Sequence, residues 1–230
     1  MARCKVYLIP SPIGNHFTDF SFAGLHAIEK LKHLFVEAED SFLGRMRARG
    51  LITPSHQVYV LDDAEACADR AAALAESCVS FGLLASSGVP CFVDPGHQVV
   101  ARLLDHHLHQ VEFVPVGMSS ALDAALAMTG QDIQRFVFGG HSPECYTLNA
   151  TVLGTGLPLI YFVRGPGIRA LLGELAAHGA AVDRVLLFKD IRKKSRFTVT
   201  LLHDASPPDG LVEDTDADYV MVILPAALRP

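Results

Sequence analysis

The chain of 230 residues contains no tryptophan and only five cysteines, which are Cys4, Cys67, Cys78, Cys91 and Cys145. The number of cysteines is odd, and no two of them have the Cys-x-x-Cys spacing. The sequence therefore predicts neither a disulfide framework nor a zinc site, and a reducing cytoplasm is the expected location.

Long apolar runs and an excess of basic residues are also missing. No stretch reaches the roughly 20 apolar residues of a membrane-spanning helix, and residues 1–5 lead into a strand-like run, not a signal peptide. We therefore expect no membrane partner. The formal net charge of −6 argues against a protein whose main task is non-specific nucleic-acid binding, although a local basic patch remains open.

Several familiar site motifs are absent. The chain has no G-x-G-x-x-G, no G-x-x-x-x-G-K-[ST] and no G-x-S-x-G, so no dinucleotide fingerprint, P-loop or nucleophile elbow is expected. His106, His107 and His109 cluster near the end of a predicted helix. Because no other element supplies converging ligands, we expect a solvated helix terminus and no metal.

The chain does contain a regular alternation of strand-like and helix-like segments. Half of its residues are hydrophobic, enough to bury the core of one large domain or two small ones. The predicted strands are 3–9, 34–38, 58–61, 81–85 and 111–114, and the predicted helices are 22–31, 42–49, 64–80 and 99–107. Asp62 or Asp63 is the expected N-cap of the third helix. This alternation predicts a mostly parallel sheet covered by helices.

The pattern changes after Pro115. Helices are predicted at 120–128 and 168–178, and strands at 136–138, 159–163, 184–188, 197–202 and 219–224. The last strands follow one another without helices, so the second sheet is expected to be mixed or antiparallel. We therefore predict an α/β protein with an N-terminal domain of residues 1–115 and a C-terminal domain of residues 116–230.

Two Gly- and Pro-rich loops follow predicted parallel strands, at residues 10–15 and 86–96. The carboxyl edge of such a sheet is where open α/β proteins bind ligands. Gly88 would let a ligand approach the main chain, and Pro90 would stiffen the turn. Each loop alone is more typical of an ordinary strand exit than of a ligand site. Cys91 is interpreted as a small apolar filler, with a reactive thiol as the alternative.

The densest basic run covers residues 189–196. It would suit a phosphate backbone or an anionic small molecule, and it equally suits a solvated connection between strands.

Taken in order, these segments resemble the tetrapyrrole methylase family, the class III S-adenosylmethionine-dependent methyltransferases. The nearest branch is the bacterial enzymes that methylate a ribose 2′-hydroxyl of small-subunit ribosomal RNA. Residues 8–15 (LIPSPIGN) resemble its strand and PTPIGN motif, 38–41 (AEDS) resemble AEDTR, and 85–96 resemble SDAGTPxxxDPG. Further matches are residues 114–121 with V-x-P-x-P-G-x-S-A, 136–143 with F-x-F-x-G-F-L-P and 159–163 with LIFYE.

Some polar positions of the family are lost. Ser86 stands where the family has Asp, Val163 where it has Glu, and Val116 where it has Pro, while residues 189–193 depart from RELTK. These losses leave open a different methyl acceptor and a weakened or absent activity.

The resemblance implies two α/β domains flanking a cleft, with folded S-adenosylmethionine between them and a homodimeric assembly. Carried over residue by residue, it implies cofactor contacts at Pro10, Gly88, Val89, Pro90, Val93, Ser119, Ser120, Val163 and Ile191. Asp40, Asp94 and His16 are the motif-borne candidates for a catalytic base or an orienting group. Each is better explained as a structural residue, because an Asp in a loop often caps a helix or closes a turn.

The resulting hypothesis is a cytoplasmic methyltransferase in ribosomal RNA processing that uses S-adenosylmethionine and acts on a ribose 2′-hydroxyl. One alternative is a methyltransferase acting on a tetrapyrrole-like small molecule. Another is a non-catalytic S-adenosylmethionine-binding module of the same fold. An unrelated hydrolase or nucleotide binder would require the ordered motif match to be a coincidence.

Overall fold

The computed structural model describes residues 3–12, 19–37, 40–91, 96–118, 120–140, 148, 150–189, 198–202 and 217–226. The chain divides into two compact units, Met1–Asp132 and Ile133–Pro230. The sequence predicts a domain boundary between residues 115 and 116. The division into compact units does not test that boundary, which stays a prediction.

The N-terminal unit is built on a five-stranded parallel sheet with the strand order β3-β2-β4-β1-β5. Its strands are β1 (Cys4–Ile9), β2 (His33–Val36), β3 (Gln57–Val60), β4 (Phe81–Leu84) and β5 (Val111–Pro115). Its helices are α1 (Phe22–Lys30), α2 (Asp40–Ala48), α3 (Ala64–Glu76), α4 (His97–His106) and α5 (Ala121–Ala127).

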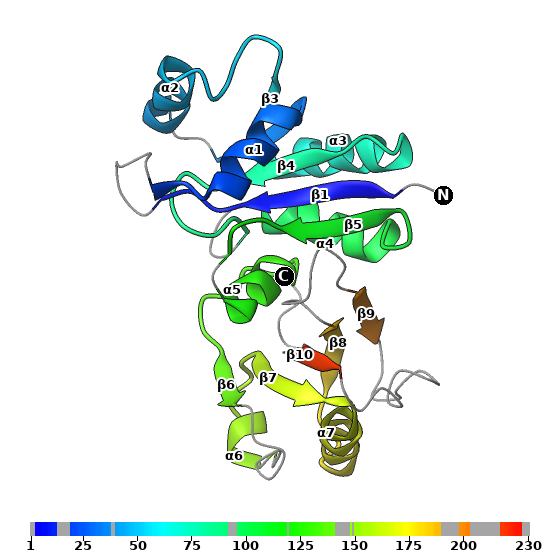
Figure 1. Cartoon of the computed structure of the whole chain (residues 1–230). Helices are drawn as coiled ribbons and strands as arrows, with labels where there is room; N and C mark the ends of the chain where they lie inside the picture. Colours follow the sequence, from blue (N-terminus) through cyan, green and yellow to red (C-terminus); the bar gives the residue numbers. More distant parts are fainter. Residues whose placement is uncertain are drawn as a thin grey trace. The chain divides into compact units, whose positions relative to one another are not determined.

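The first four helices cover both faces of this sheet. Ile28 of α1 and Phe42 of α2 share one buried cluster with Ile9 and Leu34 of the sheet. The α3 and α4 helices lie together on the other face (Figure 1), where Asp69 and Arg102 form an ion pair of 2.7 Å. This division follows from right-handed crossovers, because the chain moves toward β3 through α1 and α2 and back toward β5 through α3 and α4.

Side-chain caps fix where two of these helices begin. The Ser21 hydroxyl oxygen accepts from the Gly24 N–H at 3.0 Å, and Asp63 Oδ1 accepts from the Ala66 N–H at 3.0 Å. Of the two predicted caps of α3, Asp63 is thus the one that caps it. The helix ends at Glu76, before the predicted residue 80, because Cys78 has a φ of +55°.

The C-terminal unit contains a five-stranded mixed sheet with the order β6-β7-β10-β8-β9. The β6–β7 pair is parallel, and the other three pairs are antiparallel. Its elements are β6 (Val137–Gly140), α6 (Ala150–Leu153), β7 (Leu159–Arg164), α7 (Gly165–Ala177), β8 (Val182–Lys189), β9 (Thr198–Leu202) and β10 (Asp218–Pro225). The predicted α/β class, with a parallel first sheet and a mixed second one, is confirmed.

One close approach stands out in the core of this unit. Ile168 and Leu172 of α7 are buried with Tyr161 and Met221 of the sheet. The backbone of Gly139 lies against the Tyr161 ring, and a Cβ at that position would overlap the ring. Burial raises the pKa of Tyr161. The buried phenol therefore stays neutral and acts as a packing element.

Within the described residues, no helix combines the length and the apolar character that crossing a membrane requires. The four cysteines in this part of the chain, Cys4, Cys67, Cys78 and Cys91, are not joined by disulfides. Burial, with a smaller contribution from Cys78, raises the pKa of the Cys4 thiol to about 12. Cys91 is 1% exposed, as expected of an apolar filler.

Candidate functional site

The candidate site lies at the carboxyl edge of the parallel sheet, where β1 and β4 end side by side. Ile9 is the register partner of Leu84, so the chain leaves both strands at the same level. After β1 the chain continues to α1, and after β4 it continues to α4 on the opposite face. Neighbouring strands that send their chains to opposite faces define the point at which open α/β sheets bind ligands.

Hydrogen bonds lock the two strand exits together. Ser11 and Gly88 form an isolated antiparallel bridge in which each N–H donates to the other carbonyl at 2.9 Å. The Ser11 hydroxyl also donates to the Ala85 carbonyl at 2.5 Å, and Ser11 is buried. The two predicted ligand loops are therefore one joined structure in this unit.

Glu37, directly after β2, supports the same loop from the other side. Its Oε2 accepts from the Ser86 N–H at 2.9 Å, and its own N–H donates to the Leu84 carbonyl at 3.3 Å. The loop after β4 is thus held by the exits of both neighbouring strands. Such fixed backbone suits a binding site that must not reorganise when a ligand arrives.

Gly88 leaves its surroundings open. Its φ is +75°, and a Cβ built there would meet no atom within 4 Å. Val89 beside it is half-buried and Pro90 is buried. The turn therefore presents bare backbone to free space, where a ligand can approach the main chain without meeting a side chain.

The cavity beside this turn, lined by Glu37, Ala85, Pro90 and Cys91 among others, has no room for a water molecule. Pockets for drug-sized ligands usually measure about 300–1,000 Å³. This cavity is therefore too small to enclose a nucleoside-sized ligand.

The exit of β5 is anchored beside these loops. The Val116 N–H donates to the Leu8 carbonyl at 3.0 Å. Gly117, with a φ of +68°, packs against Ser21, the N-cap of α1. The segments that follow β1, β4 and β5 thus form hydrogen bonds with one another or with the sheet.

Part of the predicted cofactor-binding set meets at this edge. Pro10, Gly88, Val89 and Pro90 lie on the two joined loops. Ser120 is the N-cap of α5, and its hydroxyl oxygen accepts from the Leu122 N–H at 3.1 Å.

The other predicted residues lie elsewhere or are not described. Val163 belongs to the C-terminal unit, where its side chain is 1% exposed in the core. Asp40 begins α2. Val93, Ser119, Ile191, His16 and Asp94 lie outside the described residues.

Two supporting contacts were not predicted from the sequence: the Glu37 carboxylate that holds Ser86, and Ser21 as the partner of Gly117. A carboxylate at the end of a predicted parallel strand was an available signal for the first. Within the described part of the chain, no three histidine, cysteine or carboxylate side chains are grouped so as to hold a metal ion.

No protein-family model matches the chain. Two curated relatives are both named ribosomal RNA small subunit methyltransferase I. The relative from Mesorhizobium japonicum is 28% identical over 139 residues, which are 60% of this chain and 45% of that protein. The match thus spans less than half of that relative. The relative from Neisseria meningitidis serogroup B is 25% identical over 229 residues, covering 96% of this chain and 76% of that protein.

Solved structures of low identity also align with the chain. Diphthine synthase is 16% identical, with 98% of this chain and 91% of that chain covered and a TM-score of 0.35. Uroporphyrin-III-C-methyltransferase from Thermus thermophilus is 17% identical, with 96% and 94% covered and a TM-score of 0.35.

Proposed function

We propose that this protein is an S-adenosylmethionine-dependent methyltransferase of the tetrapyrrole methylase family. The Gly88 turn carries the proposal, because its bare backbone faces open space at the sheet edge where α/β proteins bind ligands. The ordered motifs and the relative that aligns with 96% of the chain support the same assignment.

The residues present fit the cofactor chemically. Uncharged main-chain groups on loops are suited to the adenosine and methionine ends, and a side chain at position 88 would occupy the space that Gly88 leaves open. The N-terminal unit would contribute Pro10, Gly88, Val89 and Pro90. From the resemblance, Val93, Ser119, Ser120, Val163 and Ile191 are proposed as further contacts.

When bound, S-adenosylmethionine supplies an activated methyl group on a positively charged sulfur. The protein's part is to align the acceptor with the S–CH₃ bond and to exclude water, and orientation alone accounts for much of such a rate. A hydroxyl acceptor also loses a proton. Asp40, Asp94 and His16 remain the proposed candidates for taking or orienting that proton.

The proposed acceptor is a ribose 2′-hydroxyl of small-subunit ribosomal RNA, modified in the cytoplasm by a homodimer. The names of both relatives support a ribosomal RNA substrate. A buried apolar Val163, at the position where the family motif has Glu, favours a second candidate, a module that binds the cofactor without methyl transfer.

Calorimetric titration of the full chain with S-adenosylhomocysteine tests the first step. We expect saturable one-site binding, and no heat of binding at millimolar ligand would rule the proposal out. Incubation with tritiated S-adenosylmethionine and small ribosomal subunits then tests the acceptor. Label in the RNA supports the methyltransferase, whereas binding without label in RNA or in a tetrapyrrole precursor supports the non-catalytic module.

A further inference from the structure

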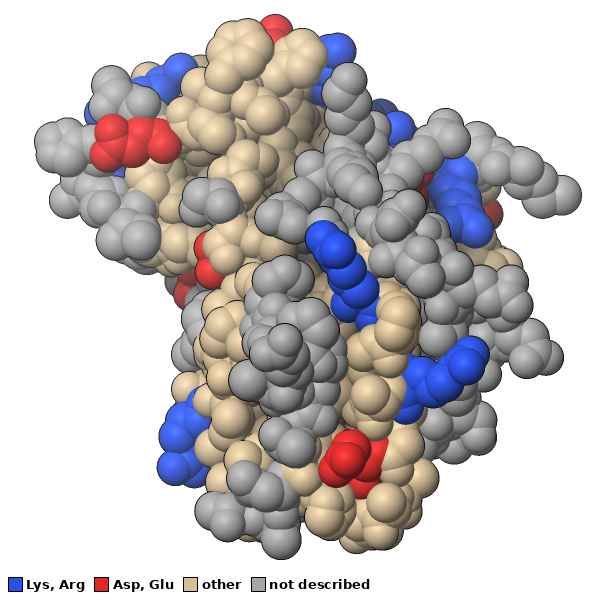
Figure 2. All heavy atoms as spheres, turned by 60° about the horizontal axis from the view of Figure 1, so that its bottom comes forward, with Lys and Arg blue, Asp and Glu red and all other residues tan. Residues whose placement is uncertain are grey.

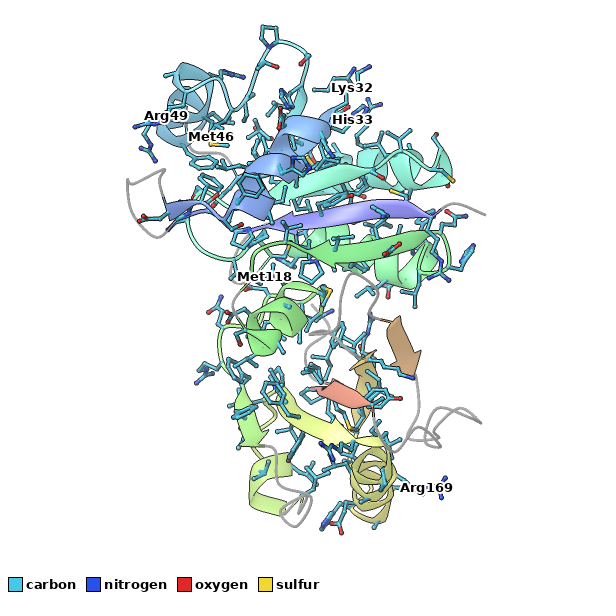
Figure 3. All side chains as sticks on the ribbon, viewed as in Figure 1. Lys32, His33, Met46, Arg49, Met118 and Arg169 are labelled. Atoms are coloured by element: carbon cyan, nitrogen blue, oxygen red, sulfur yellow. The ribbon has the colours of Figure 1, made fainter. Side chains whose placement is uncertain are left out.

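Basic and aromatic side chains gather beside the edge strand β3, around the amino end of β2. His33 is the first residue of β2, Tyr59 lies on the edge strand β3, and Arg70 lies on α3. Lys32 precedes His33, and Figure 3 shows the two near each other, toward the amino ends of the strands. We call Lys32, His33, Tyr59 and Arg70 the amino-edge cluster.

The Tyr59 ring holds this cluster in a defined arrangement. Its centroid lies 4.8 Å from that of Phe35 and 6.1 Å from that of His33, and both pairs are stacked. The guanidinium carbon of Arg70 lies 5.7 Å from the same centroid. A cation–π contact positions Arg70 without neutralising its charge. Arg70 is therefore oriented although its side chain is exposed.

Hydrogen bonds determine which ring nitrogen of His33 is available. The Tyr59 hydroxyl donates to Gln57 Oε1 at 3.0 Å, so its oxygen accepts from His33 Nδ1 at 3.1 Å. In this arrangement the hydrogen of neutral His33 sits on Nδ1. Nε2 has no hydrogen-bond partner among the described residues and becomes a second donor when His33 is protonated.

Among the residues that the structure describes, no carboxylate is paired with the cations of this cluster. In the part of the chain that is described, neither Lys32 nor Arg70 forms an ion pair, and Asp69 next to Arg70 is paired with Arg102 at 2.7 Å. Burial first, and then the charges of Lys32 and Arg70, lower the pKa of His33. The charges of Lys32 and Arg70 thus disfavour the protonation of His33.

On the face drawn in Figure 2, the described Lys and Arg side chains stand mostly apart, separated by uncharged surface. The chain as a whole carries a formal charge of −6. An anion would therefore be attracted to a local, unpaired group of cations and repelled by the rest of the molecule.

We propose that the amino-edge cluster binds a phosphate group, with Lys32 and Arg70 as charged donors and His33 Nε2 as a further donor once protonated. A guanidinium fork and an ammonium group match the several oxygens of phosphate. The phosphate belongs either to an RNA backbone, which rests on the proposed function, or to a free phosphate compound, which does not. Lys32, Arg70, Tyr59 and Gln57 are the groups that face His33.

The test compares two double variants of the full chain that remove the same charge. Lys32→Gln/Arg70→Gln removes the cluster's cations, and Lys5→Gln/Arg169→Gln removes two exposed cations elsewhere. Binding of a short fluorescein-labelled single-stranded RNA is measured by anisotropy over a series of KCl concentrations. Each lost phosphate contact lowers the salt slope by about 0.7, so we expect about tenfold or more weaker binding at about 0.1 M KCl for the cluster variant. The control variant should bind like the wild type.

A second arm uses inorganic phosphate and follows the His33 ring by NMR across a pH series. Bound phosphate should raise the pKa of His33, because it offsets the charges of Lys32 and Arg70. Weaker RNA binding by the cluster variant alone assigns the site to RNA. A phosphate-induced shift with unchanged RNA binding assigns it to a free phosphate compound. Equal RNA binding by both variants with no shift overturns the proposal. Titration of the cluster variant with S-adenosylhomocysteine separates this result from a failure of the proposed function.

Discussion

Gly117 and Ser21 approach each other so closely that a Cβ on Gly117 would lie 2.6 Å from the Ser21 Cβ and overlap its hydroxyl oxygen. The same hydroxyl oxygen caps α1 by accepting from the Gly24 N–H at 3.0 Å. Gly117 also has a φ of +68°. The exit of β5 and the start of α1 thus share a contact that only glycine permits.

Gly117→Ala should therefore be strongly destabilising. A positive φ costs about 1–2 kcal/mol for alanine, and an overpacked contact adds about 1–3 kcal/mol. At roughly 2–4 °C per kcal/mol, the melting temperature should fall by about 4–20 °C, as measured by circular dichroism.

Gly44→Ala is the matched control. Gly44 is exposed inside α2, and a Cβ there would meet nothing within 4 Å. This change should stabilise the protein by about 0.5–1 kcal/mol through helix propensity. A Gly117→Ala protein that melts like the wild type would show that the Ser21 contact is not tight.

The alternation of strands and helices was predictable because each element buries one patterned face. The ends of elements were less predictable. The Gly165-Pro166-Gly167 run is typical of a turn, yet α7 begins there, because proline is tolerated in the first turn of a helix. The end of α3 at Glu76 depends on the left-handed conformation of Cys78. This conformation is usually signalled by a glycine, and position 78 is a cysteine.

Ser11→Ala tests the joint between the two loops. The change removes the buried hydrogen bond of 2.5 Å to the Ala85 carbonyl and leaves that oxygen without this donor. We expect a loss of about 1–3 kcal/mol in the free energy of unfolding. Hydrogen exchange of the Gly88 amide, which donates to the Ser11 carbonyl, should become faster.

Ser77→Ala serves as the control for this loss. Ser77 also donates its hydroxyl to a backbone carbonyl, that of Ala73 at 2.9 Å, but in an exposed position. Its loss should cost no more than about 0.5 kcal/mol and leave the Gly88 amide unaffected. Equal effects of the two variants would argue against a special role for the Ser11 joint.

The candidate site was predictable only where neighbouring residues in the sequence define it. The Pro10 and Gly88 loops carry glycine and proline signals at the ends of apolar strands. The Ser86 N–H, however, finds its carboxylate at Glu37, 49 positions away in the chain. Glu37 lies beside Ser86 because β2 and β4 are neighbours in the strand order β2-β4-β1. Local sequence patterns do not determine this order.

The stability of the protein should depend on pH through His33. Its pKa is lowered in the folded protein by burial and by Lys32 and Arg70, so the unfolded chain takes up the proton first as the pH falls. The free energy of unfolding should therefore decrease below the unfolded-state pKa of about 6.5, until the folded protein is protonated as well.

His33→Asn isolates this contribution. Its amide N–H₂ can still donate to the Tyr59 hydroxyl oxygen, but it does not titrate. Urea midpoints measured between neutral and mildly acidic pH should fall less for the variant than for the wild type. Parallel curves for the two proteins would mean that His33 is not the group responsible.

Gly88→Ala tests whether the open turn receives the cofactor. Gly88 has a φ of +75° and Gly50, at the end of α2, has a φ of +70°, and a Cβ at either position would meet no atom within 4 Å. Both alanine variants should therefore lose a similar stability of about 1–2 kcal/mol through backbone strain alone. Of these two positions, only residue 88 lies on the loop joined to Ser11. Only Gly88→Ala should therefore raise the calorimetric Kd for S-adenosylhomocysteine. A loss of about 1.4 kcal/mol or more of binding free energy, caused by the added methyl group, would raise this Kd tenfold or more. If Gly88→Ala and Gly50→Ala bind the ligand equally well, the cofactor does not approach the backbone at residue 88, and the assignment of this edge as its binding site is wrong.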